Sequence, residues 1–183
     1  MVNMTAPTEL CTERLRLRGF SEVDIPAIVH LAGAPEIAAT TLLIPHPYKE
    51  SDAMEFLTSA EQACKKGEAV VFAITSGVTG ELYGAVGLHP DRPQARAELG
   101  FWMGVPYWGR GYCTEAIIAA VRYGFREVNL NRIFAMAFSS NAASRRVLRK
   151  AGFRHEGCLR SHVVKWGEFH DLECYGILST EQL

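Results

Sequence analysis

Apolar residues alternate with polar ones in the first part of the chain that has a clear pattern. Leu15 and Leu17 alternate with arginines at positions 14, 16 and 18, which predicts a half-buried strand. We expect the arginines to face solvent, with contacts to a substrate as the alternative. Strand-like apolar runs recur over residues 69–75, 82–89, 97–103 and 132–138, and the turns that separate the first three predict an antiparallel meander.

Helical spacing alternates with these runs. Ser21 is placed to begin a helix that reaches about residue 31, and a second helix begins near Ser51 and ends before Gly67. Between them, residues 34–47 carry three prolines, which predicts an ordered loop or a broken helix. The clearest helix carries a buried stripe of apolar residues: Ile117, Ile118, Val121, Phe125 and Val128.

The C-terminal third predicts one more helix and a long hairpin. The helix covers residues 142–151 and ends at Gly152, and the hairpin covers residues 153–178 with its turn at Trp166 and Gly167. Together these elements predict an α+β fold with a mixed sheet and helices on both faces. We find no linker or repeat, so residues 1–183 are interpreted as one domain, with residues 1–8 as a loose leader.

Composition narrows the class of function. A hydrophobic content of 48% and a charged content of 21% are those of an ordinary globular domain. A net charge of −1 argues against nucleic acid as a partner, and no apolar run is long enough to span a membrane. Five scattered cysteines without a CxxC motif predict reduced thiols in the cytoplasm, and the histidines show no metal-binding pattern.

Residues 102–125 join a strand to a helix through Gly109 and Gly111. The first amides of a helix have no partner within it and carry partial positive charge, and glycine lets an anion approach the backbone. This arrangement predicts an anion site. The alternative is that the glycines only make a turn, since a short glycine motif has low specificity.

The stretch WGRGYCTEA resembles the pyrophosphate-binding loop of the GNAT acetyltransferases, and it is most similar to the Rim-type branch that acetylates ribosomal-protein N-termini. Three further stretches carry the resemblance: TERLRLRGFSEVD, NAASRRVLRKAGF and EGCLRSHVVKWGEFHDLECYGIL. Two residues depart from the superfamily pattern. Trp108 replaces Gln or Arg, as suits the Rim branch, and Cys113 replaces a final Gly or Ala.

The resemblance implies the GNAT fold, a mixed and mostly antiparallel sheet with a central splay, and it implies acetyl-CoA as co-substrate without a metal. The family's cofactor contacts carry over to Phe101, Trp102 and Met103 on the strand, to the loop, and to Asn141 and Ser144. The loop residues are Gly109, Arg110, Gly111, Tyr112, Cys113 and Thr114. Phe101 and Trp102 are alternatively core side chains, and Asn141 is equally suited to cap a helix.

Acetyl transfer in this family needs a base that takes a proton from the amine and a group that donates a proton to the leaving thiolate. Glu98 matches the strand glutamate that serves as base in many relatives, with a surface charge as the alternative. The family's usual tyrosine donor falls at Leu148, which carries no proton to donate. The Rim branch instead offers a serine three residues after the asparagine, and the resemblance therefore makes Ser144 the candidate donor. A plain serine at a helix start is its alternative.

The acceptor side is expected to use the loop and second helix before the meander. His46, Tyr48 and Glu55 are its candidate residues, and a solvated helix face is the alternative. His162 is the fourth candidate, because the resemblance places it near a hairpin position where the Rim branch has a second candidate base. A turn at Trp166 and Gly167 would also set it opposite Asp171. That pair has a structural interpretation as well as a catalytic one.

These observations predict an acetyl-CoA-dependent N-acetyltransferase in the cytoplasm. Its acceptor is a small-molecule amine or a protein N-terminus. The alternative is a catalytically silent module that binds acyl-CoA as a sensor or scaffold. The oligomeric state stays open, with a homodimer as one option.

Overall fold

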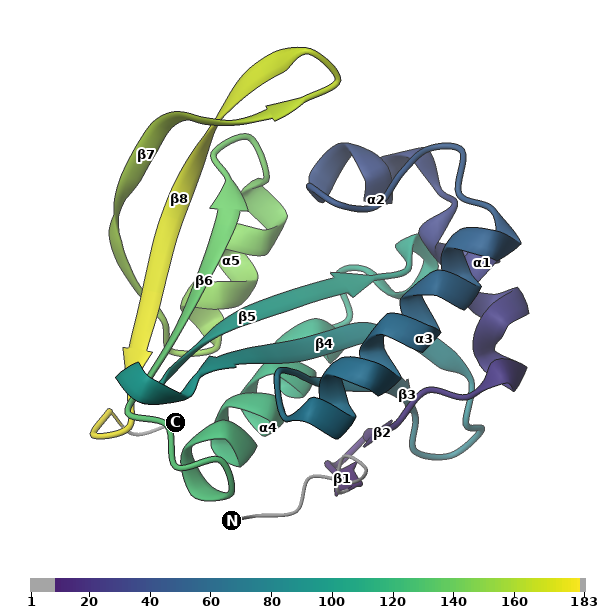
Figure 1. Cartoon of the computed structure of the whole chain (residues 1–183), viewed down its shortest axis with the longest axis horizontal. Coiled ribbons are helices and arrows are strands. Elements are labelled where there is room, and N and C mark those ends of the chain that lie inside the picture. Colours follow the sequence, from purple (N-terminus) through teal and green to yellow (C-terminus); the bar gives the residue numbers. More distant parts are fainter. Residues whose placement is uncertain (1–8, 182–183) are drawn as a thin grey trace.

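A computed structural model describes residues 9–181, which include an eight-stranded sheet of order β1-β2-β3-β4-β5-β6-β8-β7 (Figure 1). The predicted leader, residues 1–8, lies outside the described residues. Neighbouring strands are antiparallel except β5 and β6. The strands are β1 (Leu10–Cys11), β2 (Leu15–Arg18), β3 (Val70–Ser76), β4 (Leu82–Asp91), β5 (Arg96–Met103), β6 (Arg132–Phe138), β7 (Arg154–Lys165) and β8 (Glu168–Leu178).

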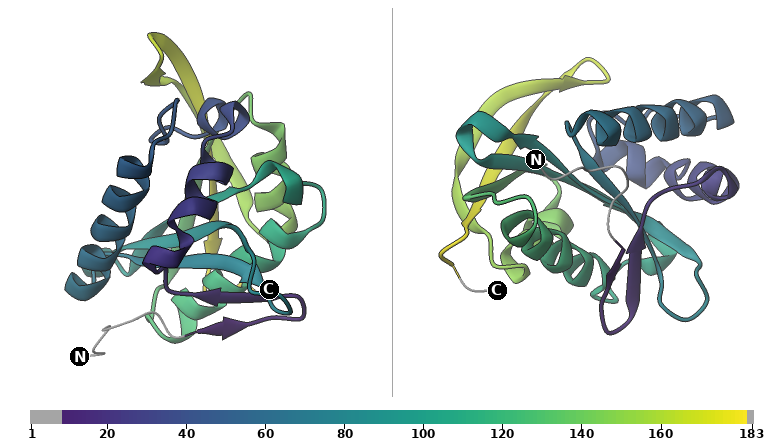
Figure 2. Two further views of the ribbon diagram at one scale, coloured as in Figure 1. Left: turned by 90° about the vertical axis from the view of Figure 1, so that its right-hand side faces the viewer. Right: turned by 60° about the horizontal axis from the view of Figure 1, so that its bottom comes forward.

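Helices cover both faces of the sheet, as the apolar pattern predicts (Figures 1 and 2). On one face lie α1 (Ile25–Ala32) and α3 (Glu50–Lys66), with the short α2 (Pro35–Thr40) between them in the chain. The other face carries α4 (Tyr112–Arg126) and α5 (Ala142–Lys150). Single 3₁₀ turns complete the chain at η1 (Glu22–Asp24), η2 (Arg92–Gln94) and η3 (Val105–Tyr107).

The two faces have separate apolar cores. The larger joins α4 and α5 to the sheet, and Ile117, Val121 and Leu148 are completely buried in it. The smaller lies under α1 and α3, around Ile28 and Ala53. Because successive strand residues point to opposite faces, each strand can supply both cores.

The sheet opens in its middle. β5 and β6 are paired only at Arg96–Arg132, Ala97–Ile133 and Glu98–Phe134. Beyond Glu98 the two strands continue without a shared ladder, while β5 stays paired with β4 and β6 with β8. The predicted central splay is therefore present, and it divides the sheet into two halves.

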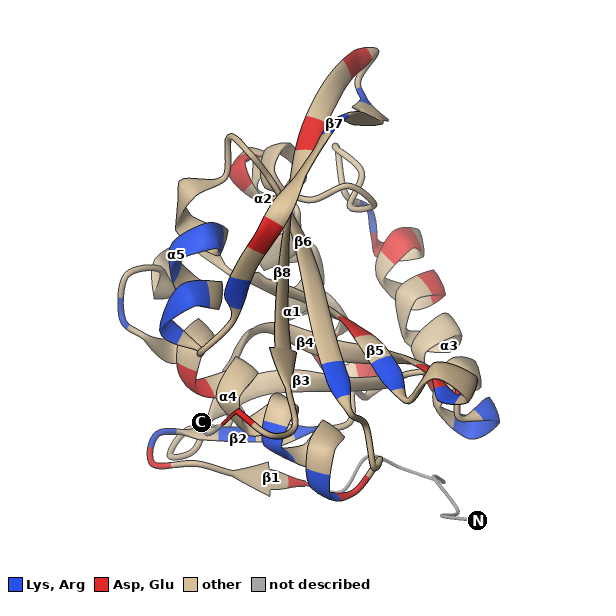
Figure 3. Cartoon of the chain, turned by 90° about the vertical axis from the view of Figure 1, so that its left-hand side faces the viewer, with Lys and Arg blue, Asp and Glu red and all other residues tan. Residues whose placement is uncertain are grey.

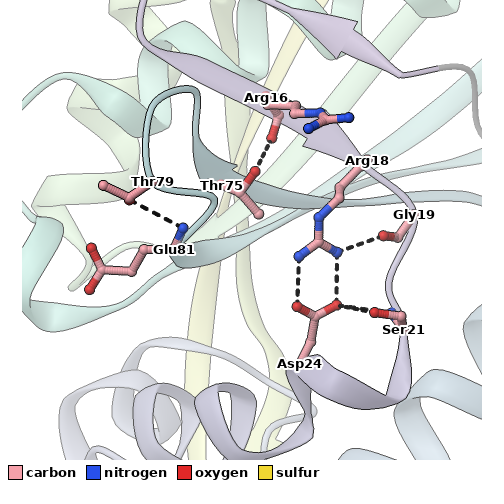
Figure 4. Close-up of polar contacts among 8 residues, drawn as sticks. All are labelled: Arg16, Arg18, Gly19, Ser21, Asp24, Thr75, Thr79 and Glu81. Carbon is pink, nitrogen blue, oxygen red and sulfur yellow. Dashed lines mark hydrogen bonds and ion pairs between the residues drawn. The ribbon is translucent and has the colours of Figure 1, made fainter.

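Arg18 and Asp24 fix the start of α1 to the end of β2 (Figure 4). The guanidinium donates to both carboxylate oxygens, at 2.8 and 2.7 Å, and Asp24 also accepts from the Ser21 backbone at 2.9 Å. Burial opposes ionisation of Asp24, but the bonds from Arg18 and Ser21 outweigh it and lower the pKa of the carboxyl. The predicted helix from Ser21 accordingly begins as a 3₁₀ turn held by Asp24 and continues as α1.

The arginines in and beside β2 face solvent and also form ion pairs. Arg14 and Arg16 are exposed, as expected, but both are also paired. Arg16 makes an ion pair with Glu9, with Nε 2.5 Å from the nearer carboxylate oxygen, and Arg14 pairs with Glu115 on α4 at 2.7 Å. Sequence periodicity indicates which face a side chain takes, but it carries no information on distant partners.

Candidate active site

A cleft of about 810 Å³ lies at the splay. One wall comes from α3, β4 and β5, and the opposite wall comes from β6, α5 and β8. The loop that follows α2 also lines it, at Thr41, Leu42, Leu43, Ile44 and Pro45. The cleft exists because β5 and β6 separate after Glu98, so it is a direct consequence of the short parallel ladder.

Glu98 lies at the point where the two strands part. It alternates with the buried Ala97 and Leu99, so its side chain points to the α3 face of the sheet and lines the cleft, half-buried. Among the described residues, none makes a hydrogen bond or an ion pair with the Glu98 carboxylate. This placement is compatible with the predicted role of Glu98 as the base, which stays a prediction.

His89 is a residue that the sequence analysis missed. It is the cross-strand partner of Glu98 in the β4–β5 ladder and also lines the cleft. Directly opposed residues of an antiparallel pair have neighbouring side chains. The sequence could have indicated this pair only through the strand register. His89 lies opposite Glu98 when the turn between β4 and β5 is placed at η2.

The α3 wall is acidic. Asp52 and Glu55 line the cleft together with Tyr48, which precedes the helix (Figure 3 shows the acidic residues of α3 in red). Burial, assisted by the charge of Asp52, raises the pKa of Tyr48 to about 12, so the phenol remains a neutral hydrogen-bond donor. Tyr48 and Glu55 thus line the cleft, and their contact with the acceptor stays a prediction. His46 is exposed and is not among the described residues that line the cleft.

The opposite wall carries Asn141 and Ser144. Asn141 caps α5: its Oδ1 accepts from the Ser144 backbone at 3.0 Å, and its Nδ2 donates to the Thr40 carbonyl at 3.4 Å. The capping interpretation is therefore confirmed, and Asn141 also joins α5 to the end of α2. Ser144 faces the cleft one turn into the helix. Leu148, at the position of the family's tyrosine, is fully buried in the larger core.

The glycine loop has the backbone geometry of an anion site. Gly109 and Gly111 have φ of 73° and 81°, a conformation that favours glycine, and Gly111 is the N-cap of α4. The first α4 amide bonded to the loop is that of Glu115, which donates to the Gly111 carbonyl at 3.1 Å. The amides of Tyr112, Cys113 and Thr114 consequently have no partner within the helix. Burial raises the pKa of the Cys113 thiol to about 12, so it stays protonated.

An ion pair braces this loop from the β2 side. Glu115 accepts from Thr12, from the Arg14 backbone and from the Arg14 guanidinium, at 2.5, 3.0 and 2.7 Å. Burial opposes its ionisation, yet these bonds lower the pKa of the Glu115 carboxyl. Arg14 also donates to the Arg110 carbonyl at 3.0 Å, inside the loop. Sequence analysis missed this role of Arg14, since its partner lies 101 residues away.

Phe101, Trp102 and Met103 have different surroundings. Phe101 and Trp102 are half-buried and line the cleft, each also packing against one of the two cores. Met103 is buried, and its carbonyl accepts a bond from the Trp108 indole at 2.5 Å. Trp108 therefore ties the turn before the glycine loop to the end of β5. That contact gives a structural reason for a tryptophan in place of Gln or Arg.

His162 does not form the expected pair with Asp171. The turn at Trp166 and Gly167 is as predicted, and the ladder holds as far as Val163–His170. It then shifts to Leu159–Leu172, so three residues of β7 oppose Asp171 alone. Asp171 accepts instead from the Ser161 backbone at 2.7 Å, and His162 is exposed, outside the described residues that line the cleft.

A family model described as an acetyltransferase (GNAT) domain matches residues 14–154, which include the splay, the glycine loop and α5. The chain belongs to the GNAT acetyltransferases. It is accordingly an acetyl-CoA-dependent acetyltransferase, with the GNAT fold that the resemblance implied. No helix within residues 9–181 is both long and apolar enough to cross a membrane.

Individual relatives agree with this assignment. The "Uncharacterized N-acetyltransferase p20" of Bacillus licheniformis is 31% identical over 173 residues, which cover 94% of this chain and 97% of p20. A GNAT-family acetyltransferase of Bacillus anthracis superposes with a TM-score of 0.85 at 26% identity, covering 95% of this chain and all of that one. The ribosomal-protein-S5-alanine acetyltransferase of Vibrio fischeri shares the fold, with a TM-score of 0.83 at 19% identity over 95% and 98% of the two chains.

Proposed function

We propose that this enzyme acetylates a primary amine that enters the cleft as a cation and has no carboxylate beside it, as at a protein N-terminus. The observation that carries the proposal is the charge of the cleft. Its described lining residues include three carboxylates, Asp52, Glu55 and Glu98, and no lysine or arginine. A chain with a net charge of only −1 thus concentrates negative charge at this site.

Electrostatics favour such an acceptor. A cation 4 Å from a carboxylate gains about 1 kcal/mol in bulk water and about 4 kcal/mol near a protein surface, and an anion loses as much. A free amino acid carries a carboxylate next to its amine, so the attraction of its ammonium to the cleft would be offset by the repulsion of its carboxylate. A protein N-terminus has a neutral peptide bond there. The Vibrio fischeri relative, named for action on a ribosomal protein, is consistent with this acceptor class.

Transfer requires the amine to lose its proton before it attacks. In our proposal Glu98 takes that proton, because its carboxylate faces the cleft without another partner among the described residues. The amine nitrogen then bonds to the thioester carbonyl carbon, and the carbon–sulfur bond breaks. The second proton that the nitrogen loses replaces the one that Ser144 gives to the thiolate. The carboxylates that attract the cation therefore include the group that deprotonates it.

Ser144 is the proposed donor to the departing thiolate. It lines the wall opposite Glu98, and its backbone is held by Asn141. The free amides at the start of α4 and the positive backbone angles of Gly109 and Gly111 support a role for residues 109–114 in binding the CoA pyrophosphate. Base and donor thus come from different halves of the splayed sheet.

A matched panel of amines tests the proposal. Thiol release from acetyl-CoA would be followed with alanine, alanine amide, an Ala-initiated peptide amide and a linear polyamine. We expect the two amides to react faster than free alanine, since they differ from it in the missing carboxylate. A preference for alanine would contradict the acceptor class. Preference for the polyamine over both amides would indicate that the acceptor is a multiply charged small molecule and not a protein N-terminus. No turnover with any amine would favour a silent acyl-CoA-binding module.

A further inference from the structure

Lys165, at the tip of the β7–β8 hairpin, reaches across to the loop that follows α2. Its Nζ donates to the carbonyls of Thr41, Leu42 and Ile44, at 2.6, 3.2 and 3.1 Å. The residue is only 7% exposed, although it comes directly before the hairpin turn. Figure 1 shows the hairpin tip at the top of the molecule, leaning toward the α2 side.

The ammonium is fully occupied by this contact. It has three N–H donors and three carbonyl acceptors, and the Trp166 ring lies 5.0 Å from Nζ. Within residues 9–181, no carboxylate lies within ion-pairing distance of it. A buried ammonium costs free energy unless it is satisfied. Here the charge is used to hold a segment of backbone.

Besides Lys165, apolar contacts of Ile44 and Tyr48 with the smaller core hold that segment. Residues 41–48 lie outside helices and strands, and none takes part in a backbone–backbone hydrogen bond among the described residues. Thr41 is tied by its own hydroxyl to the Ile37 carbonyl, and Asn141 binds the preceding carbonyl, that of Thr40. Both Asn141 and Lys165 belong to the half of the sheet that lies across the splay. The loop and the residue before it are therefore attached to the far half by two side chains, Lys165 and Asn141.

The fastened loop forms part of the cleft. Thr41, Leu42 and Ile44 line it, and they are the residues whose carbonyls Lys165 binds. Leu43, between them, is 89% exposed, and of these loop residues Ile44 is the one that packs against the smaller core. The hydrogen bonds from Lys165 therefore hold the Thr41 and Leu42 end of the loop against the opposite wall.

We propose that Lys165 is a positioning residue for the acceptor, fastening the loop of residues 41–45 across the splay and so fixing the acceptor side of the cleft. This inference rests on the proposed function, in that it assumes that the acceptor amine binds in the cleft. Lys165 touches neither Glu98 nor Ser144 through any contact in the structure, and the glycine loop lies on a different element. The effect of its loss is therefore confined to the acceptor.

Lys165→Met tests this role, because methionine keeps an unbranched side chain and removes every donor. We expect the acceptor KM to rise about ten-fold or more, with acetyl-CoA affinity within about two-fold of the wild type. Backbone amides of residues 41–44 should exchange with deuterium faster. Lys66→Met, at an exposed lysine at the end of α3, is the matched control and should change neither quantity.

Lys165→Gln keeps two N–H donors without the charge and should fall between wild type and Lys165→Met in both KM and exchange. It also preserves the test if the methionine variant does not fold. An unchanged acceptor KM in these variants would overturn the proposal, whether or not the loop exchanges faster. A loss of acetyl-CoA affinity would overturn it too. Lack of turnover in the wild type is a different outcome: it contradicts the proposed function itself, and the acceptor role falls with it.

Discussion

Gly111→Ala should weaken acetyl-CoA binding through the backbone of the glycine loop. Gly111 has φ of 81°, and an L-residue in this left-handed conformation costs about 1–2 kcal/mol. A Cβ there would also lie 3.3 Å from Nη2 of Arg14, the group that pairs with Glu115 at 2.7 Å. If the loop relaxes to relieve this strain, affinity falls about ten-fold, since a factor of ten corresponds to about 1.4 kcal/mol.

Gly80→Ala is the matched control. Gly80 has φ of 73°, a Cβ added to it would meet no atom within 4 Å, and it belongs to the β3–β4 turn, not to the glycine loop. The two variants should lose similar stability in thermal unfolding, but only Gly111→Ala should lose affinity in calorimetry with acetyl-CoA. Gly111→Glu, which adds bulk and negative charge at the proposed phosphate site, should abolish binding. Unchanged affinity in both Gly111 variants would remove this loop from the binding site.

Two further predictions concern stability and the acceptor wall. Asp24→Asn should lower the free energy of unfolding by about 2–3 kcal/mol at pH 7, because it leaves Arg18 without its charged partner. The pKa of Asp24 is lower in the folded state than in the unfolded state. The difference in stability should therefore be fully present above the unfolded pKa of about 3.9 and should disappear as the pH falls through the folded-state pKa. Denaturant titrations that show the same difference at every pH would contradict the pairing. Glu55→Ala or Tyr48→Ala should raise the acceptor KM and leave acetyl-CoA affinity nearly unchanged in calorimetry, and a loss of that affinity would show that α3 has been assigned to the wrong ligand.

Local sequence was sufficient for most elements. The strand expected over residues 132–138 is β6, and the helix expected over residues 142–151 is α5, one residue shorter. The hairpin turn at Trp166 and Gly167 was equally predictable, because two residues with positive φ match the twist of the strands. These features depend on neighbours along the chain, which is the information that periodicity and turn residues carry.

Contacts between distant elements were not predictable in this way. Arg14 binds Glu115 across 101 positions, and Lys165 binds Thr41 across 124. The bulge that separates His162 from Asp171 depends on how β7 pairs with β8, which no local pattern reveals. Glu98 was identified through a family resemblance, whereas its neighbour His89 became visible only with the β4–β5 register.

The most direct test of the proposed chemistry is the rate of thiol release by Glu98→Gln, measured against pH with saturating acetyl-CoA and the best acceptor of the panel. Glutamine keeps the shape of the side chain and removes the base. We predict a kcat lower by about 10²–10⁴, the usual contribution of a positioned general base, with acetyl-CoA affinity unchanged. Glu68→Gln, at an exposed position after α3, should retain the wild-type rate. A Glu98→Gln enzyme with the full wild-type kcat would contradict the assignment of Glu98 as the base.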